Sequence, residues 1–129
     1  MKKLLLSIFL LTVTSAWAHP DWTTNPPESA QTQLEINQWA AQEYEDADAE
    51  LNRVWNELIP KLSQGEKDSL TEAQLIWIKF RDANAKAAQA AYEGGSMAPF
   101  AFAQSRTQTT RMRTFQLRER LDELVRLGN

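Results

Sequence analysis

Hydrophobic residues recur every three or four positions along three long stretches of the chain, which is the spacing of amphipathic α-helices. The first stretch opens with Thr32 and Glu35, which match a capping box in which each side chain accepts a hydrogen bond from the other residue's backbone N–H. It closes before Pro60, which removes a backbone donor and stops or kinks a helix. Its apolar stripe comprises Ile36, Trp39, Ala40, Ala47, Leu51, Val54, Trp55 and Leu58. The pattern predicts a first helix between Thr32 and Pro60.

A second capping box, Ser63 with Glu66, opens the next stretch. Its expected buried stripe is Leu70, Ala73, Trp77, Phe80, Ala87, Ala88 and Ala91. Gly94 and Gly95 should end this helix, because glycine accepts the left-handed backbone of a helix terminus. We expect the three tryptophans of the first two helices, Trp39, Trp55 and Trp77, to lie in the core.

The third stretch has the most regular spacing, with Ser96 as its expected N-cap and Pro99 in its first turn. Phe100, Ala103, Thr107, Thr110, Thr114, Leu117, Leu121 and Leu124 step by 3 and 4 alternately, as in a heptad seam. Gly128 ends the pattern, and no stretch alternates like a strand. The sequence therefore predicts an all-α, antiparallel three-helix bundle with long helices. The small threonines of the seam should face the Ala-rich second half of the second helix.

The first 18 residues have the layout of a secretory signal peptide. Met1-Lys2-Lys3 is basic, Leu4 to Val13 is almost wholly apolar, and Ala16-Trp17-Ala18 fits a cleavage site. The apolar run is too short for a membrane span of about 20 residues, and no Cys follows it to carry a lipid anchor. We expect cleavage after Ala18 and a periplasmic or secreted protein with no membrane anchor. The expected divisions are a signal peptide (1–18), an extended Pro-containing arm (19–30) and a helical domain (31–129).

Charge is unevenly distributed along the expected mature chain, which keeps 12 basic and 17 acidic residues for a formal charge of −5. Residues 28–57 hold eight acidic side chains against Arg53, whereas residues 106–126 hold six arginines against three acids. Either the acidic first helix pairs with the basic third helix, or it attracts a cationic partner. The acidic total and the expected export argue against nucleic acid as a partner.

The residue inventory excludes much catalytic chemistry. Without Cys and with His19 as the one His, the chain offers no thiolate nucleophile, no Ser–His–Asp triad in the helical domain and no His-rich metal cage. An N-terminal His19 could chelate copper with the help of a second His, but none exists, so we expect no metal and no cofactor. Glu43, Asp46 and Glu50 share one helical face, which we interpret as a solvated face rather than a glycosidase pair. The expectation is a protein that is not an enzyme.

Four segments in combination resemble the LprI-type lysozyme-inhibitor N-terminal domain family. They are Asp48-Ala49-Glu50-Leu51-Asn52, the run from Ala73 to Asp82 that contains Gln-x-x-Trp-x-x-x-Arg-Asp, the run from Tyr92 to Pro99, and Thr110-Arg111-Met112-Arg113 with Leu117. The resemblance spans Gln31 to Leu121. It implies a small exported helical protein that inhibits lysozyme-type muramidases, whose cationic members would suit an acidic helix. Cysteines usual in the family are replaced here, as aligned, by Trp39, Ala85 and Ser105, the last two where the second and third helices would otherwise be joined.

Two groups of candidate residues follow from these motifs. Trp77, Arg81, Asp82 and Arg113 are interpreted as a structural motif in which charged side chains tie the second helix to the third. Partner binding is assigned to the turn with Tyr92, Gly94, Gly95 and Ser96 and to the acidic side chains Glu43, Asp46 and Glu50.

Three functions remain open at this point. The leading hypothesis is an inhibitor that occludes a muramidase such as a cationic lysozyme. The alternative is an envelope protein-interaction module with another partner, and the third is a peptidoglycan hydrolase that uses Glu43 or Glu50. The sequence leaves the oligomeric state undetermined.

Overall fold

Three long helices and one short 3-10 helix follow each other along the chain in a computed structural model that describes residues 22–128. They are α1 (Gln33–Leu58), η1 (Ile59–Lys61), α2 (Gln64–Ala90) and α3 (Ala98–Arg126). The described residues contain no strand, so the predicted all-α, antiparallel three-helix arrangement is confirmed. The predicted signal peptide, its expected cleavage site and His19 lie outside the described residues.

Most helix ends lie where the sequence predicted them. Both capping boxes are present, Thr32 with Glu35 and Ser63 with Glu66. α1 gives way to η1 at Ile59, next to Pro60. Gly128, with φ of 78°, follows the end of α3. None of the helices in the described part of the chain is long and apolar enough to cross a membrane.

The expected cap of α3 is wrong. Met97, and not Ser96, is the N-cap residue of α3, and it makes no side-chain capping bond. Ser96 lies inside the preceding turn, where the backbone N–H of Ala98 donates to the carbonyl of Gly95 at 3.2 Å. Pro99 lies in the first turn of α3 as predicted, because proline has no N–H to leave unpaired there.

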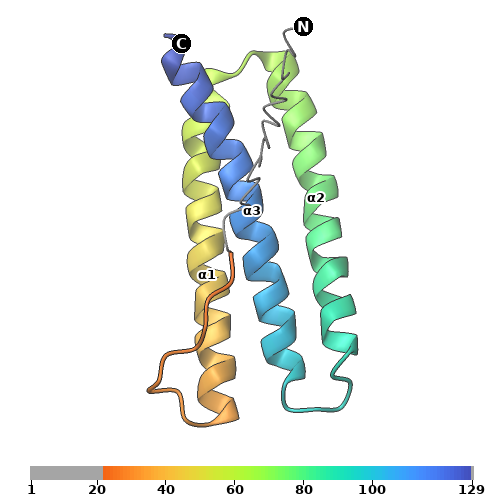
Figure 1. Ribbon diagram of the computed structural model, residues 1–129. Coiled ribbons are helices and arrows are strands. Elements are labelled where there is room, and N and C mark those ends of the chain that lie inside the picture. Colours follow the sequence, from red (N-terminus) through yellow and green to blue (C-terminus); the bar gives the residue numbers. More distant parts are fainter. Residues whose placement is uncertain (1–21, 129) are drawn as a thin grey trace, which may run out of the picture.

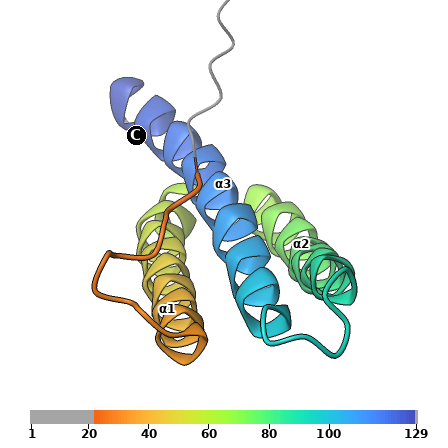
Figure 2. The ribbon, with the colours of Figure 1, turned by 60° about the horizontal axis from the view of Figure 1, so that its bottom comes forward.

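α3 is the central helix of the molecule. Figures 1 and 2 show α1 and α2 on either side of it, with the α2–α3 connection at the same end as the start of α1. The main apolar cluster lies toward the opposite end and comprises Leu51, Val54, Leu58, Leu62, Leu117, Leu121 and Leu124. Trp55 and Trp77 pack against it as partly buried side chains, whereas Trp39 is half-buried outside it.

The heptad seam of α3 is confirmed over most of its length. Thr107, Thr110, Thr114, Leu117, Leu121 and Leu124 are all buried. The hydroxyls of Thr107 and Thr114 donate to the carbonyls of Ala103 and Thr110, each at 2.9 Å. The buried Ala40 and Ala47 of α1 line the same cavities as Thr107 and Thr114. The small residues of α3 therefore meet small residues of α1.

The prediction for α2 is wrong in its central point. The buried residues of α2 are Arg81 and Ala85, while Leu70, Trp77 and Ala88 are half-buried. Ala73, Phe80, Ala87 and Ala91 of the expected stripe are exposed, so most of the Ala-rich half does not face the threonines. The physical reason is that Arg81 finds carboxylate and aromatic partners inside the bundle, and these turn its face of α2 inward.

Candidate functional site

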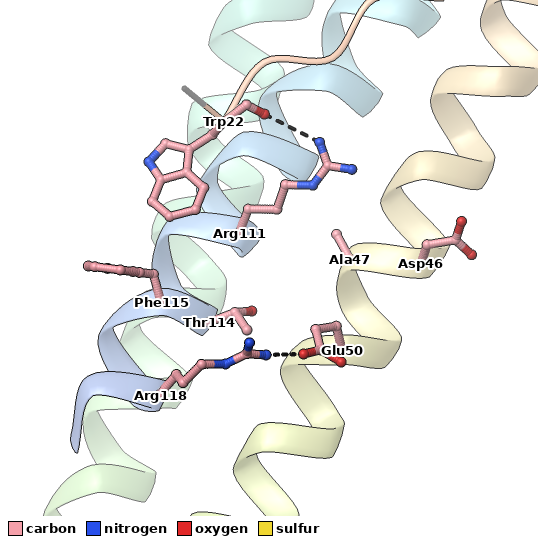
Figure 3. A pocket seen from close by; sticks show the side chains of 8 residues that line it. All are labelled: Trp22, Asp46, Ala47, Glu50, Arg111, Thr114, Phe115 and Arg118. Carbon is pink, nitrogen blue, oxygen red and sulfur yellow. Dashed lines mark hydrogen bonds and ion pairs between the residues drawn. The ribbon is translucent and has the colours of Figure 1, made fainter. Parts of the chain in front are cut away.

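A cavity of about 380 Å³ opens between α1 and α3 (Figure 3). One wall comes from α1, with Asp46, Ala47 and Glu50. The other wall comes from α3 and from the segment that precedes α1, with Trp22, Arg111, Thr114, Phe115 and Arg118. Two of the three acidic candidates of α1 thus line a cavity together with two arginines of the basic helix.

The segment before α1 is held on this groove by hydrogen bonds to an ion pair between α1 and α3. Arg111 Nη2 lies 2.7 Å from Glu43 Oε2, and both side chains are about three-quarters buried. Arg111 Nη1 also donates to the carbonyl of Trp22 and to the Thr24 hydroxyl, each at 3.3 Å, and that hydroxyl donates to Glu43 at 3.0 Å. The rings of Trp22 and Phe115 lie 5.5 Å apart between centroids. Glu43 is therefore an internal partner of Arg111 rather than a free surface charge.

Glu50 also forms ion pairs within the molecule. It forms an ion pair with Arg118 of α3 and another with Arg53 of its own helix, the latter at 2.8 Å. Hydrogen bonds from Arg53, together with the charges of Arg53 and Arg118, lower the pKa of Glu50 from 4.5 to about 2. Asp46 differs: it accepts a bond from Gln42 at 2.9 Å, and its carboxylate points away from both arginines of the cavity (Figure 3).

These pairs predict a measurable pH dependence of stability. A carboxylate with a lowered pKa in the folded state stabilises the fold above its unfolded pKa, near 4.5, and this contribution is lost as the pH falls toward 2. Glu50 is 41% exposed, so solvent screening limits the contribution to below about 1 kcal/mol. Urea unfolding should show wild type more stable than Glu50→Gln at neutral pH, with the two converging near pH 2. If the difference in the free energy of unfolding between wild type and Glu50→Gln stayed constant from neutral pH to pH 2, the lowered pKa of Glu50 would be contradicted.

A second cluster of charges joins all three helices around Arg81. This side chain is only 9% exposed, and its Nε lies 3.0 Å from Asp82 while its Nη1 lies 3.7 Å from Asp48 of α1. Its guanidinium lies 5.2 Å from the Trp77 ring centroid and 5.6 Å from that of Tyr44. Arg81 thus ties α2 to α1, a contact that the sequence did not predict.

Arg106 completes this cluster from α3. Its Nε lies 3.6 Å from Asp82, and its Nη2 donates to the Tyr44 hydroxyl at 2.6 Å. Burial raises the pKa of Tyr44, so this phenol stays neutral. Asp82 therefore bridges α2 to α3 through Arg106.

Arg113 lies outside this ion-pair cluster. It forms no salt bridge with any carboxylate in the described chain, and its Nε donates to Gln74 at 2.9 Å. Its guanidinium lies 6.0 Å from the centroid of Trp77, and burial lowers its pKa. Arg113 therefore joins α3 to α2 through a hydrogen bond and an aromatic face.

The turn between α2 and α3 is exposed but well ordered by hydrogen bonds. Gly95 N–H donates to the Tyr92 carbonyl at 2.8 Å, and Asn37 of α1 donates to the Ser96 carbonyl at 3.1 Å. Gly94 has φ of 73°, which other residues rarely adopt, and a Cβ at Gly95 would lie 3.2 Å from the Tyr92 carbonyl oxygen. The Tyr92 side chain is 47% exposed. All four turn candidates thus belong to one element, held on both sides by helices.

Sequence reasoning missed several participants in these sites, among them Trp22, Arg106 and Arg111. Arg111 belongs to the motif Thr110-Arg111-Met112-Arg113, so the sequence singled out this residue. It did not predict that Arg111 pairs with Glu43. Residues 22–128 contain no cluster of three or more potential ligands that could hold a metal ion. The arrangement offers paired charges, an aromatic-walled groove and a rigid exposed turn.

These features define a small all-helical protein in which arginines of the central helix bind carboxylates of both neighbouring helices. The chain belongs to the lysozyme inhibitor LprI family, whose sequence profile matches residues 24–117. It is also 30% identical over 106 residues to an uncharacterised protein of Rhizobium meliloti (strain 1021), an alignment that covers 72% of this chain and 76% of the relative. No solved structure matches the chain.

Proposed function

We propose that the chain is exported and acts as a non-catalytic inhibitor of lysozyme-type muramidases, with the Tyr92–Ser96 turn covering the glycan cleft of the enzyme. Membership of the lysozyme inhibitor LprI family supports a role of this kind. The signal-peptide pattern of residues 1–18 supports export to the compartment where such enzymes act.

The observation that carries the proposal is the geometry of the turn. It projects from the end of the bundle where α2 and α3 meet (Figure 1), and its backbone is fixed by hydrogen bonds from Gly95 and Asn37. Tyr92 contributes an exposed ring of the kind that dominates protein interfaces. A rigid turn loses little conformational entropy when it binds, so more of its contact energy appears as affinity.

Charge supports a cationic enzyme as the partner. Glu93, next to Tyr92, is exposed and forms no ion pair with any described residue. Glu43 and Glu50 are already paired with arginines, so they contribute to the field of the whole molecule rather than to direct contacts. The expected mature charge of −5 speeds association with a cationic protein, most strongly at low ionic strength.

The same pairing argues against hydrolysis by this chain. A glycosidase needs one carboxyl group whose raised pKa keeps it protonated as a general acid. The pKa of Glu50 is shifted in the opposite direction, to about 2. Glu43 is held by Arg111 and Thr24. Binding without covalent chemistry therefore fits the carboxylates better than catalysis does.

The test is a titration of muramidase turnover with the chain from His19 to Asn129 at low and at moderate ionic strength. We expect inhibition at both, with the tighter inhibition at low ionic strength. Turnover that stays unchanged at both would contradict the proposal. Affinity capture from an envelope extract that recovers another protein and no muramidase would favour an envelope interaction module instead.

A further inference from the structure

α2 carries an apolar stripe that faces solvent from Ala73 to Ala90. It is formed by Ala73, Ile76, Phe80, Ala83, Ala87 and Ala90, which we call the α2 flank. All six residues are exposed, with Ile76 62% and Phe80 58% exposed. Figures 1 and 2 show α2 on the outside of α3, on the side away from α1. No helix of residues 22–128 covers this stripe.

The spacing of the α2 flank is that of a helix–helix seam. Its members step by 3, 4, 3, 4 and 3 residues, the alternation by which a and d positions of a heptad line one side of a helix. The stripe runs for about 26 Å at 1.5 Å per residue. Four of its six members are alanines, which let a second helix approach closely. Two large apolar side chains lie together in the middle.

We propose that the α2 flank is a self-association surface, whose part from Ala73 to Ala83 packs antiparallel against the same part of a second copy of this chain. In the register that places Ile76 opposite Phe80 of the second copy, the two-fold axis also places Phe80 opposite Ile76. Ala73 then meets Ala83 of the second copy, so each layer beside the central pair holds two small side chains. Two large exposed apolar side chains of α2, Ile76 and Phe80, are buried against each other in this arrangement.

Charged side chains beside the stripe favour a second copy of this chain as the partner, in the register that places Ile76 opposite Phe80. Glu72, Lys79 and Lys86 border the α2 flank on one side, and none of them forms an ion pair within the described residues. With Ile76 opposite Phe80, Glu72 lies beside Lys86 of the second copy, and symmetry makes this pair twice. One like-charged contact remains, between the two copies of Lys79 at the axis.

Other arrangements are less favourable. Sliding the antiparallel pair so that Ala73 meets Ala90 places Glu72 beside Glu93 and Lys79 beside Lys86, so every flanking contact joins like charges. In a parallel pair the same charged positions meet Trp77, Asn84 and Ala91 of the second copy, none of which is charged. The antiparallel pair centred on Ile76 and Phe80 is therefore the one that matches both bulk and charge.

This association is compatible with the proposed inhibitor but does not rest on it. The two Tyr92 turns lie at opposite ends of the antiparallel pair, about 40 Å apart at 1.5 Å per residue. Each turn stays exposed, so a dimer would present two equivalent binding ends. Molecular mass reports on the association whether or not the chain inhibits a muramidase.

The first experiment measures the mass of the chain from His19 to Asn129 in solution by sedimentation equilibrium over a range of concentrations. We expect twice the monomer mass for wild type and the monomer mass for Ile76→Glu. Leu75→Glu is the matched control, because Leu75 is 59% exposed on the same helix but lies off the α2 flank. It should keep the dimer. A monomeric wild type, or equal effects of both variants, would overturn the proposal.

The second experiment tests the register by disulfide trapping, for which the chain is suited because it contains no Cys. Under mild oxidation the variant with Ala73→Cys and Ala83→Cys should form a covalent dimer, since these positions face each other across the axis. The variant with Ala73→Cys and Ala90→Cys should remain largely uncrosslinked. Preferential crosslinking of the second variant, or capture of a different envelope protein by a chain that is monomeric alone, would contradict the antiparallel self-pair. Helical circular dichroism confirms that each variant is folded.

Discussion

Replacing Tyr92 with alanine is expected to weaken inhibition of a cationic muramidase by about 30-fold, the equivalent of about 2 kcal/mol for an interface hot spot. Tyr92 presents a large amphipathic ring on a turn that is already fixed by Gly94 and by the Asn37 bond to Ser96. Removal of the ring leaves the turn in place, so the loss should appear in the inhibition constant and not in folding. The measurement is the inhibition constant of each variant under identical salt conditions.

Met112→Ala is the matched control for this prediction. Met112 is as exposed as Tyr92, at 47%, but lies on α3 away from the turn. We expect its inhibition constant to stay within about two-fold of wild type, as for surface positions outside a hot spot. Full inhibition by folded Tyr92→Ala would show that the partner binds elsewhere on the molecule.

Replacing Leu58 with alanine is expected to cost about 2–5 kcal/mol in the free energy of unfolding, the range for a Leu removed from a packed core. Leu58 is fully buried and belongs to the apolar cluster that joins α1 to α3. The chain has no disulfide to limit the loss, because it contains no Cys. Such a cost is a large share of the stability of about 5–15 kcal/mol that small domains possess.

Urea unfolding followed by circular dichroism measures this loss. Leu34→Ala is the control, since Leu34 lies on the same helix but is 66% exposed. Its effect should stay within about 0.5 kcal/mol. If Leu58→Ala were no more destabilising than Leu34→Ala, the cluster around Leu58 would not be the main core of the protein.

Features that depend on neighbouring residues were predictable from the sequence. The capping boxes at Thr32 and Ser63, the end of α1 near Pro60 and the heptad seam of α3 all follow from contacts within a few residues along the chain. Ser96 is the exception among the N-caps, and α2 ends at Ala90, ahead of the predicted Gly94 and Gly95. The turn before α3 uses backbone hydrogen bonds and the distant Asn37, so no side-chain cap forms there.

The buried face of α2 was not predictable in the same way. α2 has apolar residues on two faces, and hydrophobicity alone favours the one with Phe80 and the alanines. The structure buries Arg81 instead, because Asp48 of α1 and the rings of Tyr44 and Trp77 surround it. Some of these partners lie on α1, far from Arg81 along the sequence. Contacts between residues so far apart in the sequence produce no periodic pattern from which the buried face of α2 could be predicted. The exposed apolar face that results is the α2 flank.

The candidate site was predicted in part. The turn residues Tyr92, Gly94, Gly95 and Ser96 form one ordered element, whose role in binding a partner stays a prediction. The acidic residues do not act as a single group, since Glu43 and Glu50 each bind an arginine of α3 while Asp46 points away. The opposite charges of the first and third helices indicated this pairing, although composition alone could not say which side chains would meet.

The measurement that tests the central claim most directly is the inhibition of lysozyme turnover at several concentrations of a soluble glycan substrate. If the Tyr92–Ser96 turn covers the cleft, substrate and inhibitor exclude each other, so the apparent KM rises with inhibitor while kcat stays constant. A fall in kcat at constant KM would contradict occlusion of the cleft. Turnover that is unaffected by an equimolar amount of the protein would contradict the inhibitor role itself.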